Sequence, residues 1–186
     1  MEAELKNALI SLSYNNIILY PTDTVWGLGC DATNEKAVEK IFAIKRRSES
    51  KSLVILVDSL IMLQNYVDNI SDTIISFLKT SDKPTTVIYE HPKKLAKNVI
   101  AHNNTVAIRI VKDEFCKKLI CTFGKPIVST SANISDKPTP KSFKEIETSI
   151  LDAVDYIVNL RQNDKTQNPS MIVKLTEKDK IEVIRE

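Results

Sequence analysis

The sequence predicts an α/β fold in which a twisted, open, mixed sheet is flanked by helices. Short apolar runs of strand length alternate with amphipathic segments of helix length, which is typical of this class. Hydrophobic residues make up 42% and charged residues 27% of the chain, as in ordinary globular proteins. The 186 residues are enough for one domain with a core, and we expect a single domain over residues 1–186.

The strands are predicted from short apolar runs that end at proline, glycine or polar residues. The second of them is apolar throughout, which is typical of a strand covered on both faces. In chain order the predicted strands are Ile17–Tyr20, Ser52–Val57, Thr85–Tyr89, Val106–Val111, Pro126–Thr130, Tyr156–Leu160, Met171–Leu175 and Ile181–Ile184.

The helices are predicted from apolar residues at helical spacing and from capping residues at their ends. In the helix that follows Thr33 or Asn34, the side chain of Lys45 shares one face with Val38, Ile41 and Phe42. In chain order the predicted helices are Glu4–Leu12, the segment from Asn34 to about Lys45, helical segments from Asp58 or Ser59 to about Lys79, Asp113–Phe123 closed by Gly124, and Ser142–Ala153.

Composition and charge exclude several classes of function. The net charge of +2 does not by itself indicate nucleic-acid binding. No apolar run approaches the roughly 18 residues of a membrane span, and Met1–Asn16 lacks a signal-peptide pattern, so we expect a cytoplasmic protein without a membrane partner. The cysteines, at positions 30, 116 and 121, have no metal-ligand spacing; Cys30, Cys116 and Cys121 are interpreted as small buried thiols. The two histidines, His91 and His102, are isolated in the sequence.

Two of the three glycines of the chain lie in the stretch YPTDTVWGLGCDA, which follows a predicted strand and precedes a predicted helix. Gly27 and Gly29 therefore indicate a strand-to-helix connection. Such a connection is either a tight structural turn or an anion site on free backbone N–H groups. The spacing matches neither the P-loop nor the dinucleotide fingerprint.

A basic cluster, Lys45 to Arg47, ends the helix that follows. The simple interpretation is that these cations stabilise the helix dipole at its C-terminus. The alternative is a shared anionic ligand, which requires that the chain leave the helix at about Lys45. On extended chain Lys45 and Arg47 would share a face, whereas Arg46 would point away.

Polar side chains also alternate at the C-terminal end of a predicted strand, at Ser129, Ser131 and Asn133. They indicate either a turn into the next segment or a ligand site, because open α/β sheets bind ligands at such strand ends. No histidine or acid stands at triad spacing, which argues against a serine hydrolase. Arg109, inside the apolar run AIRI, needs a buried carboxylate or a bound anion as its partner.

Taken together, these motifs resemble the YrdC family of threonylcarbamoyl-AMP synthases in its short form. The resemblance runs from about Ile17 to Arg185 and depends on YPTDTVWGLGCDA, the Lys45-x-Arg47 pair, VAIRI, KPIVSTSAN and NPSMIV in the family order. It implies a YrdC-like fold with a concave, positively charged cavity. It also implies an enzyme, a nucleotidyltransferase that converts L-threonine, bicarbonate or carbon dioxide, and ATP into threonylcarbamoyl-AMP and pyrophosphate.

The resemblance also implies roles for particular residues. Thr22 would bind threonine, and Arg109 and Ser170 would bind threonine or phosphate. The set expected around the nucleotide, the first four of which are also the catalytic candidates, is Lys45, Arg47, Ser131, Asn133, Thr86 and Arg185. Lysine and arginine suit the stabilisation of charge on transferring phosphates, and Mg²⁺ is expected with the ATP, without assignable protein ligands.

The sequence departs from the family pattern in its turns. Serines replace two family prolines at Ser48 and Ser52, which predicts a more mobile loop there. Family glycines are replaced by Lys83 and Asp136, so turns with positive φ are expected to be made by Asp, Asn or Lys.

The product of such an enzyme feeds the modification of adenosine 37 in tRNA, so downstream tRNA threonylcarbamoyl-transfer proteins are the expected partners. An alternative is a non-catalytic double-stranded RNA or tRNA-binding module, which the near-neutral charge and 11 aromatic residues argue against. A third is a carbamoyl-transfer relative within a larger maturation enzyme.

Overall fold

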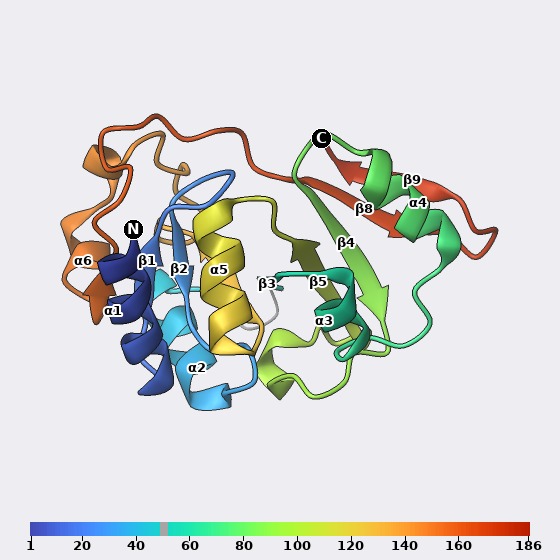
Figure 1. The fold of residues 1–186 in the computed structure, drawn as a ribbon, viewed down its shortest axis with the longest axis horizontal. Coiled ribbons are helices and arrows are strands. Elements are labelled where there is room, and N and C mark those ends of the chain that lie inside the picture. Colours follow the sequence, from blue (N-terminus) through green and yellow to red (C-terminus); the bar gives the residue numbers. More distant parts are fainter. Residues whose placement is uncertain (49–51) are drawn as a thin grey trace.

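A computed structural model describes residues 1–48 and 52–186 of the chain (Figure 1). Its strands form a nine-stranded sheet in the order β7-β1-β2-β6-β3-β5-β4-β8-β9. The strands are β1 (Ile18–Tyr20), β2 (Gly27–Gly29), β3 (Val54–Val57), β4 (Thr85–Glu90), β5 (Thr105–Ile110), β6 (Ile127–Ser131), β7 (Tyr156–Ile157), β8 (Met171–Leu175) and β9 (Ile181–Arg185).

The sheet is mixed, as the sequence predicts. The pairs β1–β7, β3–β5 and β4–β8 are parallel, and the other neighbouring pairs are antiparallel. The helices are α1 (Glu2–Ser13), α2 (Glu35–Lys45), α3 (Leu60–Gln64), α4 (Asp72–Thr80), α5 (Glu114–Phe123) and α6 (Thr148–Leu151), with 3₁₀ turns η1 (Lys97–Val99) and η2 (Phe143–Glu145). None of the helices in the described residues is long and apolar enough to cross a bilayer.

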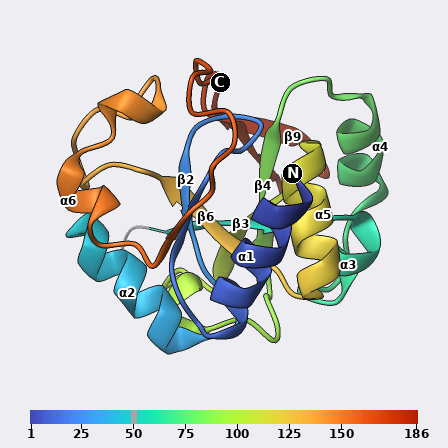
Figure 2. The same ribbon diagram turned by 60° about the vertical axis from the view of Figure 1, so that its left-hand side comes forward.

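The two faces of the sheet carry separate hydrophobic clusters. On one face, α1 and α5 pack side by side over a cluster that includes Tyr20, Leu56 and Ile127 (Figure 1). The larger cluster on the other face includes Ile55 and Val87, and α2 packs there (Figure 2). Because neighbouring residues of a strand face opposite sides, β3 and β6 contribute to both clusters, with Ile55 and Val128 in the larger one and Leu56 and Ile127 in the other.

The helix starts follow the predicted capping residues. Asn34 accepts a hydrogen bond from the amide of Ala37 at the start of α2 (3.0 Å), and Asp113 accepts one from the amide of Cys116 at the start of α5 (2.9 Å). Gly124 ends α5 with φ 73°, the left-handed conformation that favours glycine. These helices are therefore confirmed with their predicted ends.

The prediction for Gly27 and Gly29 was wrong in one respect. They lie in strand β2, paired with β1 and β6, and not in a strand-to-helix turn. A Cβ on Gly29 would lie 2.5 Å from the Tyr20 ring and 3.0 Å from the Val128 carbonyl. The glycine is therefore required by close approach across the sheet and not by a positive φ.

The predicted helix over Ser142–Ala153 was also wrong. That segment forms η2 and α6, and Glu147 between them is extended. Ser142 pairs with Lys165 in an isolated bridge, which keeps the start of the segment extended. A helix here would depend on Thr148 and its neighbours, which are weak helix formers, so tertiary contacts decide the conformation.

Smaller differences concern single residues. Cys30 and Cys116 are buried as predicted, but Cys121 is exposed. Of the two positions where a family glycine is replaced, Asp136 has the expected positive φ (66°), but Lys83 does not, so the turn at Lys83 is made without a left-handed residue there. The predicted mobility of the loop from Ser48 to Ser52 concerns residues 49–51, which lie outside the described residues.

Candidate active site

A row of directly paired residues crosses four strands of the sheet. Arg109 on β5 is paired with Thr86 on β4, Thr86 with Ile172 on β8, and Ile172 with Arg185 on β9. Directly opposed residues of neighbouring strands project from the same face. The register therefore brings Arg109, Thr86 and Arg185, which are far apart in sequence, to one face.

Arg109 is the buried end of this row, with 3% of its surface exposed. Its Nη2 lies 3.0 Å from Oδ1 of Asp23, and its Nη1 donates a hydrogen bond to Oγ1 of Thr24 (3.2 Å). The requirement for a carboxylate partner is thus met by Asp23. Its Nε has no hydrogen-bond partner among the described residues, so Arg109 keeps a buried donor for a ligand.

Thr22 belongs to the same network. Its hydroxyl donates to the Val25 carbonyl (2.8 Å), accepts from the Thr24 amide (3.1 Å), and lies 3.0 Å from the Thr24 hydroxyl. The PTDT segment is therefore a compact turn that presents Asp23 and Thr24 to Arg109. Sequence reasoning did not assign Asp23 or Thr24, although the i, i+2 spacing of the two threonines was a usable signal.

Thr86, the next residue of the row, contacts Ser170. Their hydroxyls lie 2.8 Å apart, and both residues are buried. Nη2 of Arg185 donates to the Ser170 carbonyl (2.8 Å). Burial, and then the nearby charge of Arg109, lower the pKa of Arg185. Two guanidinium groups in mutual repulsion favour an anion between or beside them.

Lys45 is the last residue of α2 and is 1% exposed. Its Nζ donates hydrogen bonds to the carbonyls of Ser131 and Asn133, the latter at 2.7 Å. Burial, and then the charge of Arg47, lower the pKa of Lys45 to about 7. The ammonium is thus held by the backbone at the end of β6.

The chain leaves the helix at Lys45, as the sequence analysis requires, but the next residue is left-handed and not extended as predicted. Arg46 is the C-cap in a left-handed conformation (φ 48°, ψ 43°) and is exposed. Arg47 turns back, and its Nη2 donates to the Ser52 carbonyl (2.9 Å). Burial lowers its pKa, against the opposing charge of Asp136. Lys45 and Arg47 thus lie near each other but differ in exposure, since Lys45 is enclosed and Arg47 is half-buried.

Ser131 and Asn133 lie at the end of β6, and Ser131 is paired with Gly27 of β2. Nδ2 of Asn133 donates to the carbonyls of Ile134 (3.0 Å) and Lys137 (2.7 Å), whereas its buried Oδ1 has no partner among the described residues. The methyl of Thr22 lies 3.6 Å from where a Cβ of Gly27 would stand. The PTDT turn and the end of β6 are therefore neighbours, and the predicted residues form two adjoining groups.

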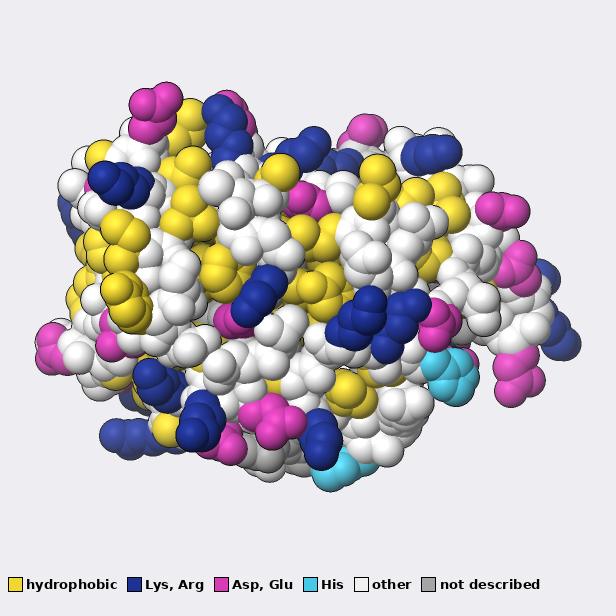
Figure 3. Space-filling model, turned by 60° about the horizontal axis from the view of Figure 1, so that its bottom comes forward, with side chains coloured by type: hydrophobic (Ala, Val, Ile, Leu, Met, Phe, Trp, Pro, Cys, Tyr) yellow, Lys and Arg dark blue, Asp and Glu magenta, His cyan; other side chains and the backbone are white. Residues whose placement is uncertain are grey.

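A groove of about 1440 Å³ has none of the predicted site residues in its lining. It runs along β4, β8 and β9, and its lining includes Ser52, which Arg47 contacts, and Ile184, which precedes Arg185. On the face seen in Figure 3, lysine and arginine side chains adjoin at one place and elsewhere mix with acidic ones. A nucleotide-sized ligand has room in this groove.

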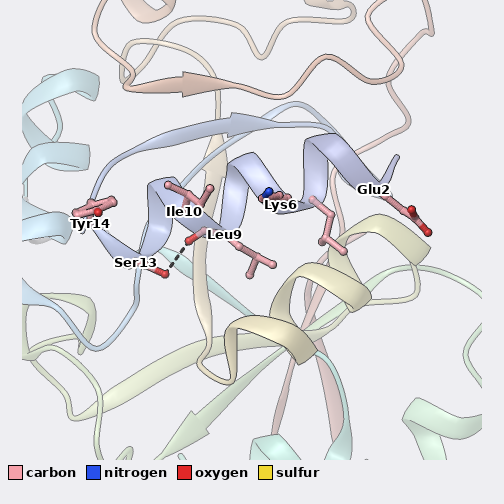
Figure 4. Close-up of a pocket in the computed structure, with 7 residues that line it drawn as sticks. Glu2, Lys6, Leu9, Ile10, Ser13 and Tyr14 are labelled. Carbon is pink, nitrogen blue, oxygen red and sulfur yellow. Dashed lines mark hydrogen bonds between the residues drawn. The ribbon is translucent and has the colours of Figure 1, made fainter.

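A second hollow, of about 570 Å³, lies on the outer face of α1 (Figure 4). Glu2 and Tyr14 lie at opposite ends of it, and the Ser13 hydroxyl donates to the Leu9 carbonyl (2.8 Å). Its lining is mainly apolar and contains none of the predicted site residues. We therefore place the candidate site at the polar residues around Arg109 and Lys45, and not at either hollow.

The carboxylates near the site are already paired. Asp23 is paired with Arg109, and Asp31 is paired with Lys125 (2.7 Å). Residues 1–48 and 52–186 contain no group of three or more histidine, cysteine, aspartate or glutamate side chains placed to hold a metal ion. The described residues therefore provide no cluster of several carboxylates for a metal ion, although both carboxylate oxygens of Asp23 lack a hydrogen-bond partner there.

Comparison with known proteins gives the family. The model for the Sua5/YciO/YrdC family, described as "Telomere recombination", matches residues 11–186. The chain belongs to this family. A threonylcarbamoyl-AMP synthase from Pseudoalteromonas translucida is 35% identical over 177 residues, 92% of each chain, and one from Blochmanniella pennsylvanica is 32% identical over 173 residues, 90% of this chain and 87% of that one.

Solved structures agree on the fold. The structure of Sua5 from P. abyssi complexed with L-threonine superposes with a TM-score of 0.84 at 27% identity, over 95% of this chain and 52% of that one. This chain therefore spans about half the length of the P. abyssi protein. YciO from E. coli has a TM-score of 0.85 at 22% identity, over 100% of this chain and 90% of its own. The predicted YrdC-like α/β fold and the family resemblance are both confirmed.

Proposed function

We propose that the chain is a threonylcarbamoyl-AMP synthase, which condenses L-threonine, bicarbonate or carbon dioxide, and ATP into threonylcarbamoyl-AMP and pyrophosphate. The observation that carries the proposal is the network of polar residues around buried Arg109, in a chain whose 35% identical relative bears that name. A relative with the same fold is described as a complex with L-threonine, which supports an amino-acid site.

The amino-acid half of the site is assigned to the network around Arg109. Arginine recognises a carboxylate through its planar fork, and Arg109 retains an unused Nε donor. Thr22 and Ser170 are proposed to bind threonine from either side of it. Each is already oriented by hydrogen bonds, Thr22 within the PTDT turn and Ser170 to Thr86. A preorganised polar site of this kind loses little freedom on binding.

The nucleotide half is assigned to the end of α2, the end of β6 and the sheet edge. Half-buried Arg47 and exposed Arg185 are proposed to contact phosphate oxygens. Burial lowers the pKa of both guanidinium groups, and an anionic ligand would compensate that cost. The complete proposed nucleotide set is Lys45, Arg47, Thr86, Ser131, Asn133 and Arg185.

The chemistry requires positioning more than a nucleophile from the protein. The threonine amine first forms a carbamate with bicarbonate or carbon dioxide. A carbamate oxygen then forms a bond to the α-phosphorus while the bond to the leaving pyrophosphate breaks. Arginine and lysine side chains stabilise the charge that develops on the phosphates. Mg²⁺ would accompany the triphosphate, bound through phosphate oxygens.

The proposed product belongs to the modification of adenosine 37 in tRNA. Downstream proteins that transfer the threonylcarbamoyl group to tRNA are then its consumers, in the cytoplasm. Direct tRNA binding is not required by this chemistry, because the adenylate carries the activated group.

The test is pyrophosphate release from ATP with threonine and bicarbonate omitted in turn. The proposal predicts release only when both are present. Release that needs neither compound would contradict it. Tight, salt-sensitive binding of double-stranded RNA without any release would favour the non-catalytic RNA-binding alternative.

A further inference from the structure

One guanidinium group joins three segments that are far apart in the sequence. Arg161 follows β7, and its Nη1 and Nη2 lie 2.6 and 3.2 Å from the two carboxylate oxygens of Asp113, the cap of α5. Its Nη2 also donates to the carbonyl of Pro21 (3.3 Å), directly before Thr22. This bidentate contact is the strong form of an arginine–carboxylate pair.

The pair is better protected than an ordinary surface ion pair. The side chain of Arg161 is 35% exposed and that of Asp113 is 10% exposed. For comparison, the Lys118–Glu114 pair on the same helix is 52% and 70% exposed. Exposed pairs contribute little because water and salt screen them, so the Arg161 pair is the one expected to constrain the structure.

The backbone of Arg161 is itself constrained. Its φ of 54° lies in the left-handed region, which is unfavourable for a residue with a Cβ. Such a conformation persists only where the surroundings hold it. Here the surroundings are Asp113, the Pro21 carbonyl and the Asp164 amide, which donates to the Arg161 carbonyl (3.1 Å), so the side-chain contacts and a backbone turn together hold this conformation.

The same segment holds the PTDT turn at a second point. The amide of Gln167 donates to the carbonyl of Thr24 (2.7 Å). Residues 161–167 therefore hold the turn at its first carbonyl, that of Pro21, and at that of Thr24. Between these two points lie Thr22 and Asp23, and Asp23 pairs with Arg109.

We infer that Arg161 is a positioning residue for the amino-acid half of the site, acting through Pro21 and Asp113 to fix the PTDT turn beside Arg109. The inference rests on the proposed function, because it assigns the affected half to threonine. Arg161 does not touch the ligand. It reduces the freedom of the turn before binding, so its loss weakens threonine binding while ATP binding is preserved.

The experiment compares Arg161→Ala, Arg161→Gly and Asp113→Asn with the unaltered chain. We expect the KM for threonine to rise by about fivefold to tenfold in both Arg161 variants, with the KM for ATP changed less than about twofold. Glycine relieves the left-handed backbone but removes the side chain, so equal effects of Ala and Gly assign the role to the guanidinium. Asn retains the helix cap, so Asp113→Asn isolates the ion pair.

The matched control is Lys118→Ala, which removes the exposed ion pair on α5 without touching Pro21. It should leave both KM values unchanged. In the double variant of Arg161→Ala with Asp113→Asn, the effect should be smaller than the product of the two single effects. An equal rise of both KM values, or wild-type kinetics in Arg161→Gly, would overturn the inference.

A second readout separates this inference from the proposed function. Hydrogen exchange at the amide of Thr24, which donates to the Thr22 hydroxyl, is measured in the protein without ligands. We expect faster exchange in Arg161→Ala than in Lys118→Ala, whatever reaction the chain performs. Unchanged exchange would overturn the positioning role, whereas a wild-type chain without threonine-dependent pyrophosphate release would overturn only the proposed function.

Discussion

The two halves of the candidate site hold their central cation in opposite ways. In the amino-acid half, buried Arg109 meets side chains, the carboxylate of Asp23 and the hydroxyl of Thr24. In the phosphate half, buried Lys45 meets backbone carbonyls, those of Ser131 and Asn133. The first charge is neutralised by an opposite charge, and the second is stabilised by dipoles at a strand end. Removal of Arg109 and removal of Lys45 should therefore lower the free energy of unfolding by different amounts.

The largest expected effect is on the amino-acid half. Arg109→Met would leave the Asp23 carboxylate buried without its counter-charge, which costs about 3–5 kcal/mol in the free energy of unfolding. Lys45→Met leaves polar carbonyls but no charge, and should cost about 1–3 kcal/mol. Urea unfolding of both variants measures the difference. Adding Asp23→Asn to Arg109→Met should recover part of the loss, and equal costs for the two single variants would contradict the comparison.

The rate of turnover should distinguish the roles of the three basic residues at the end of α2. We expect Lys45→Ala and Arg47→Ala each to lower the rate of pyrophosphate release by roughly 100-fold, because each removes a cation or an anchor near the phosphates. Arg46→Ala should change the rate less than about twofold, since Arg46 is exposed and only caps the helix. Arg46→Asn, which tolerates a left-handed backbone, controls for the cap. Similar losses in all three would contradict the assignment.

The helix end was predictable because it depends on local geometry. The spacing of Lys45 and Arg47 was enough to predict that the helix ends at about Lys45 and that Arg46 points away, and in the structure the helix ends there and Arg46 is exposed. The alternation of strands and helices was readable for the same reason, since apolar periodicity is a local property of the sequence.

The amino-acid half could be predicted only in part. The need of Arg109 for a partner follows from its apolar strand, but the choice of Asp23 depends on how β1 and β5 are placed in the sheet. Arg161 and Asp113 show the same limit, because 48 residues separate them. The failure at Ser142–Ala153 has a related cause, since a bridge to Lys165 decides that segment. Contacts between distant segments are not encoded in local pattern.

The two glycines of β2 offer a smaller test of how the halves meet. Gly29→Ala would place a methyl group 2.5 Å from Tyr20 and 3.1 Å from Ile127, which should cost about 1–3 kcal/mol in unfolding free energy. Gly27→Ala meets only the movable Ser129 hydroxyl at 3.1 Å and should cost less than about 1 kcal/mol. Thermal unfolding of both proteins measures this, and a larger cost at Gly27 would show that β2 is packed differently.

The smallest expected effect is on acid stability. Burial would raise the pKa of Asp113, but hydrogen bonds from Arg161 and from the Cys116 amide outweigh it and lower the pKa below its usual 3.8. The stabilisation by this group is therefore complete above its unfolded pKa and is lost as the pH falls through the lower folded value. Asp113→Asn should flatten the acid limb of the unfolding free energy between about pH 5 and pH 2.5. An unchanged limb would mean that the Arg161 contact is not formed in solution.

The central proposal is that the protein condenses threonine, bicarbonate and ATP into one adenylate. It is tested most directly by incubating the protein with ATP, L-threonine and carbon-13-labelled bicarbonate and identifying the product by mass spectrometry. The account predicts one product that contains AMP, threonine and the labelled carbon, formed in equal amount to pyrophosphate. Pyrophosphate formed without a labelled, threonine-containing adenylate would contradict it.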